Sequence, residues 1–80
     1  METIEVTAHF DSEGRITPLT FVWKGRSYRI EDTGRRWEAK DGIHILVMVT
    51  GNRAFHLIFD NISVIWKLIR SSEQPTVPQM

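Results

Sequence analysis

Apolar residues recur at every second position over most of this chain. A spacing of two places the apolar side chains on one face of a β-strand, whereas a helix would repeat them every three to four residues. The clearest runs are Ile4, Val6, Ala8 and Phe10, then Leu19, Phe21 and Trp23, then Phe55, Leu57 and Phe59. The pattern therefore predicts β-strands and no long helix.

Short segments rich in Gly, Asp and Asn separate these apolar runs. Lys24-Gly25-Arg26 is typical of a tight hairpin turn, and Gly51-Asn52 predicts a two-residue hairpin connection. A sheet in a chain of 80 residues must curl onto itself to bury one of its faces. We therefore expect an all-β fold: a small, strongly bent antiparallel sheet or partly open barrel of five to six strands, SH3-like in size.

The length predicts a single domain, which we place at residues 3–70. Residues 71–80 contain two prolines and no apolar periodicity, so we expect a flexible C-terminal tail. Residues 31–41 are interrupted by Gly34 and leave two alternatives open. They form either a strand bent at Gly34 or a loop with a short helical turn.

Composition excludes several classes of protein. The absence of cysteine excludes disulfide scaffolds, thiolate zinc sites, iron–sulfur clusters and cysteine nucleophiles. Ten Lys and Arg residues balance ten Asp and Glu residues, which argues against a strongly electrostatic nucleic-acid binder. The longest apolar stretch, residues 43–49, is far shorter than the ~20 residues of a membrane helix. No signal-peptide pattern follows Met1, and we expect a cytoplasmic protein with no membrane association.

The chain carries no motif of a known catalytic centre. Nothing in it is similar to a Ser-His-Asp elbow, a phosphate-binding loop or a dinucleotide fingerprint. A core of this size also leaves little room for a deep pocket. We therefore expect no catalytic residues, no cofactor and no enzymatic activity.

The three histidines are the candidate metal ligands. In a two-residue Gly51-Asn52 connection, opposed residue numbers sum to 103, so His44 would face Phe59 and His56 would face Val47. That register places the two histidines on opposite faces of the sheet. Because a zinc ion needs its ligands brought together, the sequence predicts no metal site.

The strands expected within residues 43–69 are apolar on both faces. A small sheet buries one face well, and contiguous exposed apolar area usually marks an interaction surface. The second apolar set comprises Leu46, Ile58, Ile65 and Ile69. We expect a non-catalytic module that binds a protein partner or a second copy of itself, through this face or an unpaired sheet edge. The alternative is barrel closure, which would bury parts of both faces.

Basic and aromatic residues are interleaved between Trp23 and Trp37. Several small β folds bind single-stranded nucleic acid by stacking bases on aromatic rings and pairing phosphates with cations. We expect Trp23 and Tyr28 to pack in the core instead. The alternative function is therefore weak nucleic-acid binding through Lys24, Arg26, Arg29, Arg35, Arg36 and Trp37.

Several of these segments together form a family-like pattern. Residues 18–30 contain Phe21-x-Trp23-x-Gly25-x-x-Tyr28, a later tryptophan follows at position 37, and residues 55–60 and 65–68 form a closing strand pair. The pattern resembles a family of short bacterial proteins classified as a domain of unknown function. The resemblance covers about residues 4–69. It implies a small β fold and a bacterial, cytoplasmic setting, and it supplies no catalytic residues.

Overall fold

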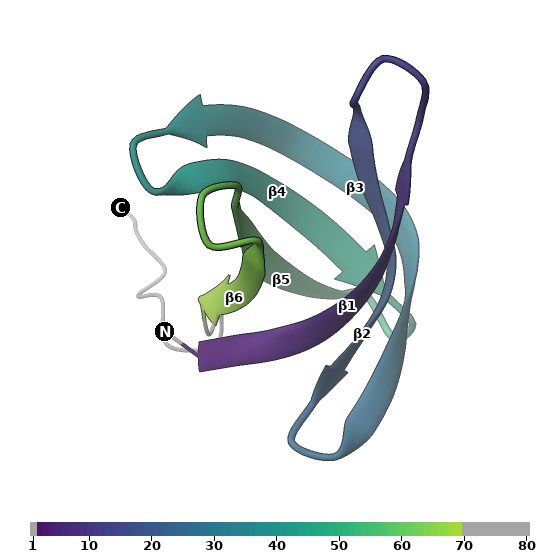
Figure 1. The fold of residues 1–80 in the computed structure, drawn as a ribbon. Coiled ribbons are helices and arrows are strands. Elements are labelled where there is room, and N and C mark those ends of the chain that lie inside the picture. Colours follow the sequence, from purple (N-terminus) through teal and green to yellow (C-terminus); the bar gives the residue numbers. More distant parts are fainter. Residues whose placement is uncertain (1, 70–80) are drawn as a thin grey trace, which may run out of the picture.

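Six antiparallel strands form a closed barrel in the computed structural model, which describes residues 2–69. The strands are β1 (Glu2–Phe10), β2 (Ile16–Trp23), β3 (Arg26–Ala39), β4 (Gly42–Val49), β5 (Arg53–Asp60) and β6 (Ile65–Ile69). They follow one another around the barrel in chain order (Figure 1). The expected all-β fold is confirmed, and the barrel is closed rather than partly open. The predicted tail, residues 71–80, lies outside the described residues.

Strand β1 closes the barrel because it pairs with two different strands. Its first part, Glu2–Ile4, pairs with β6, and its second part, Glu5–Phe10, pairs with β2. The β1–β2 register shifts between Thr7 and Ala8, and such a shift bends a strand and increases its twist. In the part of the chain that the structure describes, no helix is long and apolar enough to span a membrane.

Strand β3 also bends between two partners. Residues Arg26–Arg29 pair with β2, and the residues from Ile30 onward pair with β4. The β3–β4 register shifts twice, and Gly34 lies within the second shift. Most of residues 31–41 therefore form a bent strand, and the alternative of a loop with a short helical turn is wrong.

The pairing between β2 and β3 covers only the second half of β2 and the first four residues of β3. Thr20↔Arg29 is its last register pair within residues 2–69, so the first residues of β2 and the second part of β3 separate from each other. The bent β3 can be followed across the barrel in Figure 1. A hollow of about 200 Å³ lies at this separation, lined by Thr17–Leu19 and Ile30–Thr33. We call this line of separation the β2–β3 seam.

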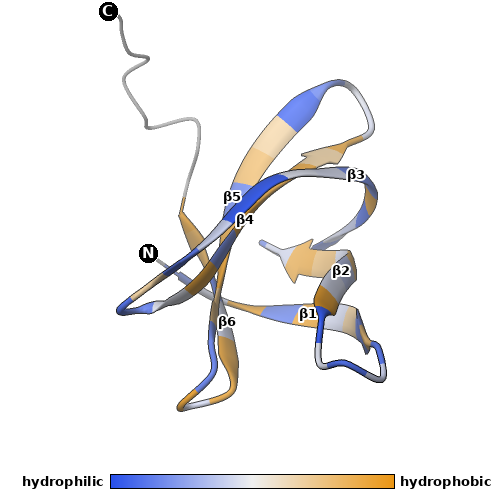
Figure 2. Ribbon diagram, turned by 90° about the horizontal axis from the view of Figure 1, so that it is seen from above, coloured by the Kyte–Doolittle hydropathy of each residue, from blue (hydrophilic) through white to orange (hydrophobic). Residues whose placement is uncertain are grey.

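The barrel interior holds the apolar side chains that alternate along the strands. Fully buried residues include Phe21, Ile45, Leu57 and Leu68. The Phe21 ring stacks on Tyr28 at 5.0 Å between ring centroids. Half-buried Trp23 and Tyr28 pack against this core, as expected from the sequence. In Figure 2, much of β2 is hydrophobic in colour, whereas β3 is largely pale or blue.

The up-and-down order sorts the turns between the two ends of the barrel. The β1–β2, β3–β4 and β5–β6 turns lie at one end, which we call the upper end, as in Figure 1. The β2–β3 and β4–β5 turns lie at the other. At the upper end, the exposed ring of Phe10 contacts the buried ring of Phe59 edge-on, with centroids 6.1 Å apart.

Gly42 begins β4 where no side chain fits. Its φ is +133°, and an added Cβ would overlap the backbone carbonyl of Phe59.

We predict that Gly42→Ala lowers the free energy of unfolding by about 3 kcal/mol or more, because both conformation and space oppose the methyl group. Gly51→Ala is the matched control: its φ is +89°, but no atom lies within 4 Å of an added Cβ. It should cost about 1 kcal/mol. If urea denaturation gives the same loss of unfolding free energy for Gly42→Ala and Gly51→Ala, the close approach of the Phe59 backbone to Gly42 is contradicted.

Candidate functional site

The β4–β5 hairpin places both of its histidines on the outward face of the barrel. Val49 pairs with Arg53, so the connection is the three-residue segment Thr50–Asn52 and opposed residue numbers sum to 102. His44 therefore lies opposite Ile58, and His56 lies opposite Leu46. The predicted register, with the histidines on opposite faces, is wrong by one residue. A slip of one residue moves every side chain of a strand to the other face.

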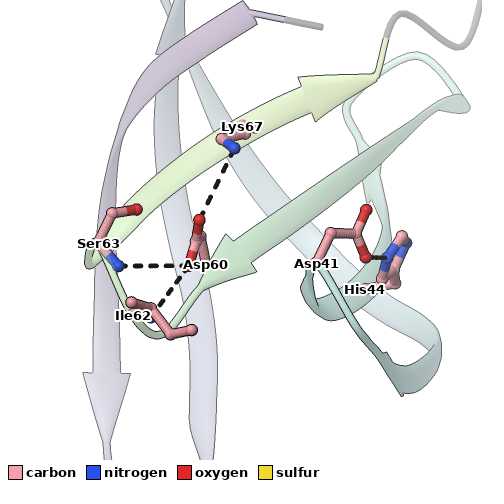
Figure 3. Close-up of polar contacts among 6 residues, drawn as sticks. All are labelled: Asp41, His44, Asp60, Ile62, Ser63 and Lys67. Carbon is pink, nitrogen blue, oxygen red and sulfur yellow. Dashed lines mark hydrogen bonds and ion pairs between the residues drawn. The ribbon is translucent and has the colours of Figure 1, made fainter.

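The two histidine rings are joined by a hydrogen bond. His44 Nδ1 lies 2.8 Å from His56 Nε2, and His44 Nε2 lies 2.7 Å from the Asp41 carboxylate (Figure 3 shows Asp41 and His44). Because the carboxylate only accepts, a neutral His44 carries its proton on Nε2. Its Nδ1 is then an acceptor, and His56 Nε2–H donates to it. Both of these hydrogen bonds can therefore be made with the two rings neutral.

The indole of Trp37 covers this pair. Its ring stacks on His44 with centroids 5.0 Å apart and an interplanar angle of 21°, and it lies 5.3 Å from the His56 ring. His44 is only 8% exposed although it faces outward. The guanidinium of Arg35 lies 5.5 Å from the centroid of the Trp37 ring. We call Asp41, His44, His56 and Trp37 the histidine cluster.

The histidine cluster favours the neutral form of one ring. Burial lowers the pKa of His56, and the neighbouring His44 lowers it further. The hydrogen bond from His44 lowers the pKa of the Asp41 carboxyl. The arrangement is a hydrogen-bonded chain that runs from Asp41 through His44 to His56. Among residues 2–69 no group of three His, Cys, Asp or Glu side chains could hold a metal ion.

The predicted apolar set lies on the same outward face but is unevenly accessible. Leu46 and Ile69 are half-buried on either side of His56, which pairs with both. Ile65 is 37% exposed, whereas Ile58 is 1% exposed between its cross-strand neighbours His44 and Lys67. A partner would therefore contact the residues around Ile58 rather than Ile58 itself.

The most exposed large apolar side chains of the described residues lie in the β5–β6 turn. Ile62 is 88% exposed and Val64 is 69% exposed. Val64 also has a φ of +59°, a conformation that a β-branched residue rarely adopts. From the alternation alone, Val64 is expected to share the buried face of Trp66 and Leu68. The structure instead ends β5 at Asp60 and begins β6 at Ile65, which leaves Val64 in the turn.

Asp60 organises this turn. Its Oδ1 accepts hydrogen bonds from the backbone N–H groups of Ile62, at 2.9 Å, and Ser63, at 3.3 Å (Figure 3). Its backbone carbonyl accepts a third from the N–H of Val64, at 2.8 Å. The N–H groups of Ile62 and Ser63 are the largest causes of the lowered Asp60 pKa. The turn is therefore held in one shape by its own backbone and by Asp60.

The predicted basic set is spread along β3 and the turn that precedes it. Lys24 and Arg26 lie at the lower end of the barrel, where the Lys24 ammonium is 5.0 Å from the Trp23 ring centroid. Arg29 is exposed and lies opposite Thr20, at the last register pair before β2 and β3 separate. Arg35, Arg36 and Trp37 lie in the second part of β3, and Arg36 faces inward opposite Ile45. The structure brings Arg35 and Trp37 together but does not gather all six residues into one patch.

Comparison with known proteins adds no assignment to this geometry. No family model, no curated protein and no solved structure matches the chain. The resemblance to a bacterial family of unknown function stays a prediction. Conclusions about function therefore depend on the residues of this structure.

The lowered pKa of His56 predicts a dependence of stability on pH. As the pH falls, His56 binds a proton at a higher pH in the unfolded chain than in the folded chain. Acid therefore favours unfolding. The resulting stability is fully present above the ordinary histidine pKa of 6.5 and is lost as the pH falls below it. Between about pH 7.5 and pH 5.5, we expect the urea concentration at the unfolding midpoint to fall less in His56→Gln than in the wild-type protein. The control His9→Gln replaces an exposed histidine outside the histidine cluster. An unchanged pH dependence in His56→Gln would refute the assignment.

Proposed function

We propose that this chain is a non-catalytic protein-interaction module, and that the β5–β6 turn is its principal contact. The observation that carries this proposal is the exposure of Ile62 and Val64 at 88% and 69%. Contiguous exposed apolar side chains usually mark an interaction surface. A second copy of the chain is the partner that we test first.

The conformation of Val64 supports selection for binding rather than for folding. A left-handed backbone costs a non-glycine residue roughly 1–2 kcal/mol, and glycine or asparagine would avoid most of that cost. The other non-glycine residues at positive φ are Lys24 and Asn52 within residues 2–69, and both are polar turn residues. Val64 has the same unfavourable backbone conformation, and its exposed side chain is apolar. Backbone strain of this kind is often found at functional sites.

The apolar turn continues onto neighbouring surface. Ile65 follows it directly and is 37% exposed. Phe10 is 55% exposed and lies at the same upper end of the barrel, against Phe59. A partner seated on the β5–β6 turn could therefore also cover part of the outward face of β6 and the exposed ring of Phe10.

A protein partner fits these surfaces better than a nucleic acid. The exposed turn offers branched aliphatic side chains, whereas single-stranded nucleic acid is bound by aromatic stacking and cations. Trp37 already stacks on His44 and lies beneath Arg35. The distribution of Lys24 and Arg26 at the opposite end from Trp37 also gives no continuous track for a strand. Nucleic-acid binding therefore stays the alternative.

We predict opposite effects of Val64→Gly on stability and on association. Glycine relieves the positive φ, so the free energy of unfolding should rise by about 1 kcal/mol. Loss of the exposed isopropyl group should weaken self-association at least fivefold in sedimentation equilibrium. Ile62→Ser should weaken association to a similar extent, because its side chain is exposed rather than packed.

Lys24→Gly is the matched control for Val64→Gly. Lys24 has a φ of +53° in an exposed turn at the other end of the barrel, so glycine relieves similar strain there. We expect increased stability with unchanged association. A wild-type protein that stays monomeric at millimolar concentration would overturn self-association through this turn. Equal association of wild type, Val64→Gly and Ile62→Ser would overturn the role of the turn.

A further inference from the structure

A second hollow opens at the upper end of the barrel, on the β2–β3 seam. Its volume is about 360 Å³. Three of its lining residues, Ile16, Trp37 and Ile43, are apolar, and Arg15, Arg36 and Glu38 are charged. The size lies near the lower limit of ligand pockets in proteins. It would accommodate a small group, such as one amino-acid residue, rather than a large cofactor.

Neither arginine of this hollow forms an ion pair with a described residue, although the Arg15 charge lies near the Asp11 carboxylate and, after the backbone hydrogen bonds to that carboxylate, contributes to its lowered pKa. Within residues 2–69, no ion pair or side-chain hydrogen bond joins Arg15 or Arg36 to a carboxylate. Arg36 is half-buried on the inward face of β3, opposite Ile45. Burial lowers the pKa of Arg36, and the charge of Arg15 lowers it further. An anion that bridges the two guanidinium groups would offset this repulsion through charge-assisted hydrogen bonds.

The strand beside the hollow has a free edge. Beyond Arg29, β3 pairs with β4 on one side and has no register pair with β2 on the other, along the described chain. The smaller hollow at Thr17–Leu19 and Ile30–Thr33 lies farther along the same seam. Free strand edges bind extended peptides through main-chain hydrogen bonds, while hollows accept alternate side chains.

We propose that the hollow binds the C-terminal residue of an extended polypeptide, whose carboxylate pairs with Arg15 and Arg36. The side chain of that residue contacts Ile16 and Ile43. The preceding residues lie along the free edge of β3. This site goes beyond the proposed function: it is separate from the β5–β6 turn, so either proposal can fail alone.

A peptide carboxylate fits the hollow better than a phosphate group. Glu38 lines the same space and would repel a doubly charged phosphate more strongly than a singly charged carboxylate, and it can accept a hydrogen bond from a peptide N–H beside the carboxylate. Arginine pairs with carboxylates in bidentate geometry. Glu31 and Asp32, which line the smaller hollow, would favour a basic residue earlier in the peptide.

The test uses a hexapeptide, acetyl-Lys-Thr-Val-Thr-Val-Leu, with a free C-terminal carboxylate, and the same peptide with a C-terminal amide. Binding is followed by amide NMR shifts of the labelled full chain. We expect shifts at Ile16 and at residues 36–38, with the amide at least tenfold weaker than the acid. An eight-residue oligothymidylate is titrated in parallel to detect phosphate recognition.

Arg36→Gln and Arg15→Gln should each weaken binding of the acid at least fivefold without affecting the amide. Arg29→Gln is the matched control, because Arg29 is an exposed arginine of the same strand outside the hollow. A dispersed amide spectrum shows that each variant is folded. Equal binding of acid and amide, or no binding of the acid, would overturn the proposal. Stronger shifts of the same residues by the oligonucleotide would overturn it in favour of phosphate recognition.

Discussion

The register of the β4–β5 hairpin is the constraint on which the two faces of this barrel depend. A connection of three residues, Thr50–Asn52, sets Val49 opposite Arg53. That pairing turns Ile45 and Leu57 into the core and turns His44 and His56 outward. A slip of one residue would exchange the two sets and expose the core. The buried apolar set on one face therefore fixes the position of the histidine cluster on the other.

The β5–β6 turn and the β2–β3 seam are where folding requirements are least strict. Closure of the barrel already buries Phe21, Leu57 and Leu68 without help from the turns. The β5–β6 turn is then free to expose Ile62 and Val64, because Asp60 and the turn backbone hold its shape. The separation of β2 from β3 leaves a further free edge. Surface features that do not help folding are the natural candidates for binding.

Much of the fold follows from the sequence. The period-two alternation predicts the strands, and Lys24-Gly25 predicts the β2–β3 turn. The β4–β5 register does not follow, because Gly51-Asn52 fits both a two-residue and a three-residue connection. Val64 continues the alternation of Trp66 and Leu68, so its place in the turn is apparent only from the hydrogen bonds to Asp60. The residue at which β2 and β3 separate has no local signal in the chain.

The position of the two histidines tests the β4–β5 register most directly. Nuclear Overhauser spectra recorded near pH 7.5 would report which protons lie close to the ring of His56. The register with Leu46 opposite His56 predicts contacts between the His56 ring and the rings of His44 and Trp37. Contacts of the His56 ring with the core side chains Ile45 and Leu57, and none with His44, would contradict it.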